Sequence, residues 1–147
     1  MTILSAREIE AAIISNLPPI DHHDEIVEEI GKDFIRIRLP FKQDFLGREP
    51  WQDASGKVFS GPMVMGFADT AMYCCVLSVM GLSVIPVMVN LNVTFLRPMR
   101  DADMIATAQI KRRGKRLNYL ECWLHSDGDA EPCAHVTSTY RVAKRQL

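Results

Sequence analysis

One acid interrupts a long apolar stretch near the middle of the chain. Residues 60–81 read SGPMVMGFADTAMYCCVLSVMG, and Asp69 is the only charged residue among them. Burying a carboxylate without a partner costs several kcal/mol, so this acid needs either a partner or a task. Burial also raises a carboxyl pKa toward the range in which the group accepts a proton near neutral pH. Asp69 is therefore the first candidate for chemistry.

A second candidate, the backbone at Gly61, lies about two helical turns before Asp69. Pro62 suits the first turn of a helix and Gly81 suits its end, so residues 62–80 are predicted to form one helix. A helix N terminus offers unpaired N–H groups to a negative charge, and Gly61 permits a ligand to approach closely. We expect the Gly61 N–H to stabilise an oxyanion while Asp69 acts as base or nucleophile. The alternative is that Asp69 only bonds neighbouring backbone or a partner helix.

The rest of the chain is predicted to form one α+β domain, residues 1–147, in which a curved sheet wraps around this helix. Residues 1–19 form a short N-terminal helix and linker, since Ser5 and Glu8 make a capping box and Pro18-Pro19 stops the helix. Two strands flank the turn at residues 31–33. Four antiparallel strands follow the central helix as a meander, with turns at 113–114 and 127–129.

Composition narrows the class of protein further. A chain of 147 residues with a net charge of −1 gives no global reason to bind nucleic acid. A membrane span at residues 62–80 is disfavoured by Asp69 at its middle and by the lack of a basic flank. Arg7, Glu8 and Glu10 interrupt any secretory signal. The four cysteines lack metal-ligand spacing, so we expect reduced core thiols and a cytoplasmic location.

Three motifs taken in order carry a family resemblance that covers the chain from about residue 25 onward. These are GFADTAMY in the central helix, NLNVTFLRP two dozen residues later, and IKRRGKRL followed by AHVTSTYRV. Together they resemble the hot-dog thioesterase superfamily, in particular its phenylacetyl-CoA thioesterase-like branch. The resemblance implies a hot-dog fold, a homodimer or homotetramer with sites between subunits, and hydrolysis of acyl-CoA thioesters without metal or organic cofactor.

The resemblance also assigns residues. The family places His-Gly-Gly before the central helix and the catalytic acid nine positions after the His, which matches Asp69 and Gly61. Ser60 stands where the His is usual, and Pro62 replaces the second Gly. An Asn found in some members corresponds to Ala54, with Gln52, Asp53 and Ser55 as polar neighbours, and a water-holding Ser or Thr corresponds to Met88. Thr70 is a candidate replacement for that hydroxyl, and Pro62 and Met88 are candidate substrate contacts. These departures leave a non-catalytic acyl-CoA or acyl-carrier sensor as the alternative function.

Basic residues form the remaining candidates. The family binds CoA phosphates with basic side chains in comparable places, which here are Arg97, Arg100, Lys111, Arg112, Arg113, Lys115 and Arg116. The alternative is a hairpin tip that only faces water. His22, His23 and Asp24 lack the spacing that a metal site would need. His125 and His135 are either ordinary strand residues or neighbours in one site.

Overall fold

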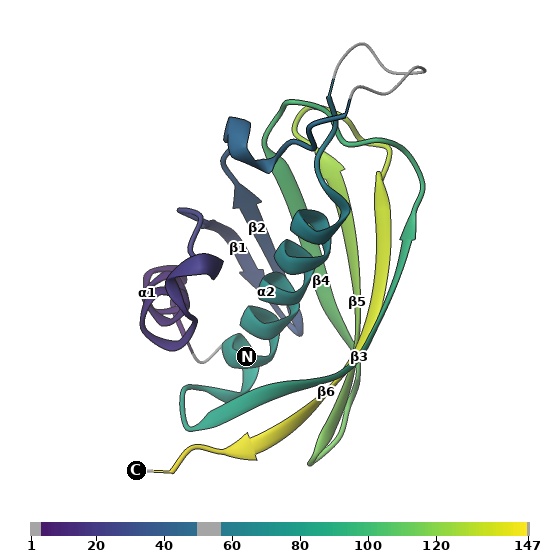
Figure 1. Cartoon of the computed structure of the whole chain (residues 1–147). Coiled ribbons are helices and arrows are strands. Elements are labelled where there is room, and N and C mark those ends of the chain that lie inside the picture. Colours follow the sequence, from purple (N-terminus) through teal and green to yellow (C-terminus); the bar gives the residue numbers. More distant parts are fainter. Residues whose placement is uncertain (1–3, 50–56, 147) are drawn as a thin grey trace.

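The computed structural model describes residues 4–49 and 57–146. Within these residues, six antiparallel strands form one sheet that curves around a long helix (Figure 1), as the α+β hot-dog prediction requires. The elements in chain order are α1 (Ala6–Asn16), the 3₁₀ turn η1 (Pro19–Asp21), β1 (Ile26–Gly31), β2 (Phe34–Leu39), the 3₁₀ turn η2 (Gln43–Phe45), α2 (Gly61–Met80), β3 (Val84–Phe95), β4 (Met104–Arg113), β5 (Leu117–Ser126) and β6 (Ala134–Lys144).

Alternation of side chains explains why the strands cover the helix with one face. In β2, Ile35, Ile37 and Leu39 are fully buried, while Arg36 lies on the other face and is exposed. In β4 every second residue from 104 to 110 is buried as well: Met104, Ala106, Ala108 and Ile110. Small alanines in this set leave room for α2 to pack closely on the sheet.

The order of the strands corrects the predicted meander. The sheet runs β1-β2-β4-β5-β6-β3, so β3 pairs with β6 and not with β4, which follows it in the chain. β4 instead pairs with β2, with Leu39 opposite Met104. The turns predicted around Gly114 and Gly128 do join β4 to β5 and β5 to β6. Alternation within a strand cannot reveal this order, because it fixes which face is buried and not which strand is the neighbour.

The central helix begins at Gly61, one residue earlier than predicted, and ends at Met80. Ser60 is its N-cap, and the Ser60 hydroxyl accepts a hydrogen bond from the Met63 N–H at 3.3 Å. Gly81 closes the helix with a φ of 84°, a value that favours glycine. The helix is long and apolar enough to cross a membrane, yet most of it is buried inside the protein, so it is the core helix.

The N-terminal helix α1 packs beside β1 and α2 (Figure 1). The predicted capping box is present, since Ser5 and Glu8 each accept the backbone N–H of the other at 3.2 Å. Glu10 ties the helix to the sheet by accepting the Val27 N–H at 2.8 Å. The helix ends at Asn16, two residues before Pro18.

Candidate active site

Asp69 lies in the first half of α2 and faces β6. The hydroxyl of Tyr140 donates to Asp69 Oδ1 at 2.5 Å and is 3.2 Å from the main-chain oxygen of Asp69. Asp69 is half-buried, whereas Tyr140 is 1% exposed. The acid therefore has the partner that its position requires, and it keeps part of its surface open.

Three influences set the protonation of Asp69. Burial is the largest and raises the carboxyl pKa; the hydrogen bond from Tyr140 lowers it, and the nearby charge of Asp21 raises it. The net result is a pKa above the usual value for aspartate. A raised pKa makes the carboxylate a stronger base than a solvated aspartate, as proton abstraction from water requires.

Gly61 is the first residue of α2 and has space beside it. A Cβ placed on Gly61 would lie 3.7 Å from Phe95 Cζ, which is an ordinary contact. Asp69 follows Gly61 by eight positions, and at 1.5 Å of rise per residue this is about 12 Å along the helix. One carbonyl group cannot contact the Gly61 N–H and the Asp69 carboxylate of the same chain, because each contact needs a distance of roughly 3 Å.

A cavity of about 490 Å³ opens on a face of α2 that includes Thr70, and we call it the first cavity; Asp69, the residue before Thr70, is not one of its lining residues. Its helical wall consists of Ser60, Pro62, Met63, Gly66, Phe67 and Thr70. The opposite wall carries Asp21 and His23 from the segment around η1, and Lys42, Asp44 and Phe45 from the segment around η2. The sequence candidates Ser60, Pro62 and Thr70 therefore share one cavity.

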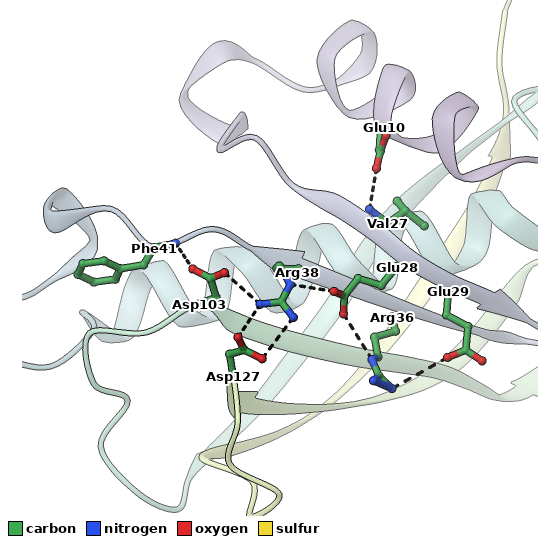
Figure 2. A network of polar contacts seen from close by, with 9 residues as sticks. All are labelled: Glu10, Val27, Glu28, Glu29, Arg36, Arg38, Phe41, Asp103 and Asp127. Carbon is green, nitrogen blue, oxygen red and sulfur yellow. Dashed lines mark hydrogen bonds and ion pairs between the residues drawn. The ribbon is translucent and has the colours of Figure 1, made fainter.

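An ion-pair network anchors the segment that forms part of this wall (Figure 2). Arg38 of β2 binds Glu28 at 2.8 Å, Asp103 at 3.0 Å and Asp127 at 2.9 Å. The second oxygen of Asp103 accepts the Phe41 N–H at 2.7 Å. This network holds the chain that leaves β2 to Asp103, just before β4. It thereby fixes the start of the segment whose residues Lys42, Asp44 and Phe45 line the first cavity.

A second cavity of about 480 Å³ borders the N terminus of α2 and contains Gly61. The other described residues that line it are mostly apolar: Val58, Phe59, Val64, Phe95, Leu96, Pro98 and Met99, with Arg97 as the one charged side chain among them. Arg97 is engaged within the chain, because Asp129 and Glu131 both pair with its guanidinium. Such pairing occupies the donors that a CoA phosphate would use.

The basic hairpin lies at the other end of the molecule from Gly61. The turn between β4 and β5 sits beside the end of α2, where the Asn118 amide lies 3.7 Å from the Met80 sulfur, whereas the α2 N terminus meets the far end of β3 (Figure 1). Arg113 is paired with Asp33. Among the described residues no carboxylate pairs with the exposed cations at the tip: Lys111, Arg112, Lys115 and Arg116.

The hydroxyl of Thr70 donates to the Gly66 carbonyl of its own helix at 3.1 Å, although Thr70 lines the first cavity. Met88 lies on β3, is 37% exposed and belongs to neither cavity. Residues 52–55, which are predicted to correspond to the region of the family Asn, lie outside the described residues.

The four histidines named as candidates have separate partners in the structure. His22 contacts the Leu17 carbonyl at 2.7 Å, while His23 lines the first cavity with its ring edge-on to Phe45. His135 binds Glu121 at 2.9 Å, and His125 contacts the Ser126 carbonyl. Across residues 4–49 and 57–146, no group of three His, Cys, Asp or Glu side chains is arranged to hold a metal ion. The four cysteines are free and buried.

Tyr140 is the site residue that sequence reasoning missed. It lies 71 positions after Asp69, so no local pattern connects the two. A signal was nevertheless present, because Ala134, Val136, Ser138 and Tyr140 form the inward face of β6. A buried tyrosine needs a partner for its hydroxyl, and α2 carries a single carboxylate.

A curved sheet around a central helix with a mid-helix acid defines the class of protein. The family model of the Thioesterase superfamily matches residues 56–133, just over half of the chain. The chain belongs to the thioesterase superfamily. The predicted resemblance is confirmed at this level.

Solved structures agree with the fold. A candidate thioesterase from Silicibacter sp. TM1040 is 23% identical, with a TM-score of 0.83 over 97% of this chain and 94% of its own. A thioesterase from Haemophilus influenzae is 15% identical, with a TM-score of 0.79 over 97% and 92% of the two chains. A thioesterase variant from Pseudomonas aeruginosa is 14% identical, with a TM-score of 0.79 over 97% and 96%. No curated protein sequence matches the chain at a significant level.

Proposed function

We propose that the protein is an acyl-CoA thioesterase that hydrolyses small, medium-chain or aromatic acyl-CoA. The observation that carries the proposal is the half-buried Asp69, whose pKa is raised and whose neighbour in α2, Thr70, lines the first cavity. Thioester hydrolysis needs a base or nucleophile and a donor for the oxyanion, and α2 offers both types of group. Membership of the thioesterase superfamily supports this class of reaction.

In the proposed reaction, the Asp69 carboxylate takes a proton from water as the water oxygen bonds to the thioester carbon. The Gly61 N–H stabilises the oxyanion that forms on the carbonyl oxygen. The C–S bond then breaks, and the CoA thiolate leaves and receives the proton. A direct attack by Asp69 on the carbonyl carbon, followed by hydrolysis of the anhydride, uses the same two groups.

The separation of about 12 Å between Gly61 and Asp69 favours a homodimer, or a tetramer of two such dimers, as the active form. In that assembly Asp69 of one copy and Gly61 of another act on one substrate. β3 is a suitable interface because it is an edge strand of twelve residues. Its exposed apolar side chains include Val87, Met88, Val89 and Phe95. An exposed edge of this length and character is a ready template for pairing with a strand of another chain.

The unpaired cations of the hairpin are suited to the CoA phosphates. A two-fold axis that sets two copies of β3 side by side in opposite directions would bring the hairpin of one copy toward the Gly61 end of the other. The second cavity, which is mostly apolar, is suited to the acyl group.

The test is release of free thiol from a panel of acyl-CoAs, with Asp69→Asn as the critical variant. We expect turnover by the wild-type protein and none by Asp69→Asn, since the amide cannot take a proton. Glu121→Gln is the matched control, because it neutralises another half-buried carboxylate, on the outer face of the sheet. Full activity of Asp69→Asn would refute the role of Asp69. Thermal stabilisation by acyl-CoA without any turnover would instead favour the sensor function, to which Ser60 and Pro62 point as departures from the family pattern.

A further inference from the structure

The contact between Tyr140 and Asp69 joins the inner face of β6 to the central helix. Tyr140 is 1% exposed and its position is set by the strand, since it pairs with Asn118 of β5 and Met88 of β3. Its hydroxyl reaches both Oδ1 and the main-chain oxygen of Asp69. A rigid ring held on two sides by neighbouring strands fixes the place of this hydroxyl better than a flexible side chain would.

The two carboxylate oxygens of Asp69 differ in their hydrogen bonding. Oδ1 accepts a charge-assisted hydrogen bond of 2.5 Å, whereas Oδ2 has no hydrogen-bond partner among the described residues. The carboxylate is therefore held in one orientation and has one oxygen left to act. Asp69 is not itself a lining residue of the first cavity, but its neighbour Thr70 and Asp21, whose charge raises the Asp69 pKa, both line it, and Asp69 keeps part of its surface open.

Tyr140 remains a hydrogen-bond donor at every pH at which the protein is studied. Burial raises the pKa of its phenol far above the ordinary value, and the negative charge of Asp69 raises it further. The other titratable groups that face the pair are Asp21 from η1, Cys74 from α2 and Cys122 from β5. The pKa values of both thiols are raised by burial, so the two cysteines stay neutral beside the pair.

We propose that Tyr140 is a positioning residue for hydrolysis: its hydroxyl holds the Asp69 carboxylate in its reactive orientation through the hydrogen bond to Oδ1. The inference rests on the proposed function, because it gives Asp69 a reaction to perform. Tyr140 does not itself touch the substrate. Its effect passes through Oδ1 of Asp69.

The main test is Tyr140→Phe, which deletes the hydroxyl and keeps the ring. We expect kcat to fall about 10- to 100-fold, the size expected for one hydrogen bond to a charged group, and KM to stay within about twofold. The hydroxyl favours the ionised form of Asp69, so its loss raises the Asp69 pKa. The acid limb of the kcat/KM profile should therefore move to higher pH.

Tyr73→Phe is the matched control. Tyr73 lies one turn after Asp69 on α2, is 7% exposed, and its hydroxyl accepts from the Asn16 amide at 3.2 Å without contacting Asp69. Both variants remove one buried phenol hydroxyl next to the same helix. We expect a comparable fall in melting temperature from both, and a change of kcat and of the pH profile only from Tyr140→Phe.

Asp69→Glu is a second test of the same contact, and it remains usable even if Tyr140→Phe does not fold. The substitution keeps a carboxylate at a half-buried position but displaces it from the Tyr140 hydroxyl by one methylene. We expect a loss of kcat that resembles the loss from Tyr140→Phe. The double variant should lose little more than either single one, because both changes break the same contact.

The outcomes separate this inference from the proposed function. If Asp69→Asn is inactive while Tyr140→Phe behaves as Tyr73→Phe does, Tyr140 is a structural residue and the inference is wrong, although the function stands. If Asp69→Glu and Tyr140→Phe have losses that multiply, the contact does not position the acid. If Asp69→Asn hydrolyses acyl-CoA as fast as the wild type, the proposed role of Asp69 is wrong, and the inference about Tyr140, which depends on that role, is wrong with it.

Discussion

The two halves of α2 have similar apolar composition and different surroundings. From Ala71 to Val79 every residue is buried, and none of them lines either cavity. From Gly61 to Thr70 the helix is open on one side, where Pro62 and Gly66 are exposed and Asp69 is half-buried. The C-terminal half therefore holds the sheet together, and the N-terminal half presents backbone and side chains to the cavities.

The comparison shows that hydrophobicity alone does not distinguish a core segment from a reactive one. The two halves of α2 differ in how closely other elements pack against them. β2, β4 and β5 pack against α2, while the segments around η1 and η2 meet its first turns loosely enough to leave the first cavity. Substitutions in the C-terminal half should therefore change stability, and substitutions in the N-terminal half should change activity.

The largest effect is expected in the buried half. Leu77→Ala removes a fully buried side chain, so we expect the free energy of unfolding to fall by about 2–5 kcal/mol. The kcat of the folded fraction should be unchanged, because Leu77 borders neither cavity. Met65→Ala, at a half-buried position in the other half, should cost less. Denaturant titration with parallel activity measurements checks both, and equal losses from the two would remove the distinction between the halves.

The sequence predicts much of this helix and little of what surrounds it. Its start, to within one residue, and its end follow from local signals at Pro62 and Gly81, and the sequence itself shows Asp69 near its middle. Likewise the burial of Ile35, Ile37 and Leu39 follows from alternation. Such features depend on neighbours a few residues away, which one sequence displays directly.

Features that join distant segments could not be predicted. The pairing of β3 with β6 and the contact of Tyr140 with Asp69 both depend on register between strands far apart in the chain. The pairing of Arg97 with Asp129 and Glu131 is not visible in the sequence for the same reason, although Arg97 itself is predicted as a basic candidate. Likewise, nothing local indicated that the hairpin lies at the opposite end from Gly61. The chemical types of the site residues were thus predictable, while their partners were not.

The next effect is expected at the first residue of the open half. Gly61→Pro removes the backbone N–H that is proposed to bind the oxyanion, and proline is favoured in the first turn of a helix. Ser60 already has the extended backbone that a following proline requires, with φ −65° and ψ 142°. We expect kcat to fall about 100- to 1000-fold, the cost of losing one oxyanion donor.

Gly61→Ala is the control for this substitution, since it keeps the N–H and places its Cβ at an ordinary distance of 3.7 Å from Phe95. Its activity should remain near that of the wild type. Melting temperatures establish that both variants fold. If Gly61→Pro and Gly61→Ala are equally active, the N–H of Gly61 does not bind the oxyanion.

The smallest effect sharpens the boundary between stability and activity within the open half. Ser60 stands where the family usually has a histidine, yet its hydroxyl is used by the helix as the N-cap that accepts the Met63 N–H. Ser60→Ala should therefore cost about 1 kcal/mol of stability, as the loss of a cap does, with kcat little changed. Ser60→Asp should recover the stability, because aspartate caps equally well and suits the positive end of the helix dipole. Thermal unfolding and thiol release measured on both variants decide the point. If Ser60→Asp restores the melting temperature while both variants lose activity, the hydroxyl takes part in the reaction, and Ser60 belongs with Asp69 and Gly61 among the reactive groups.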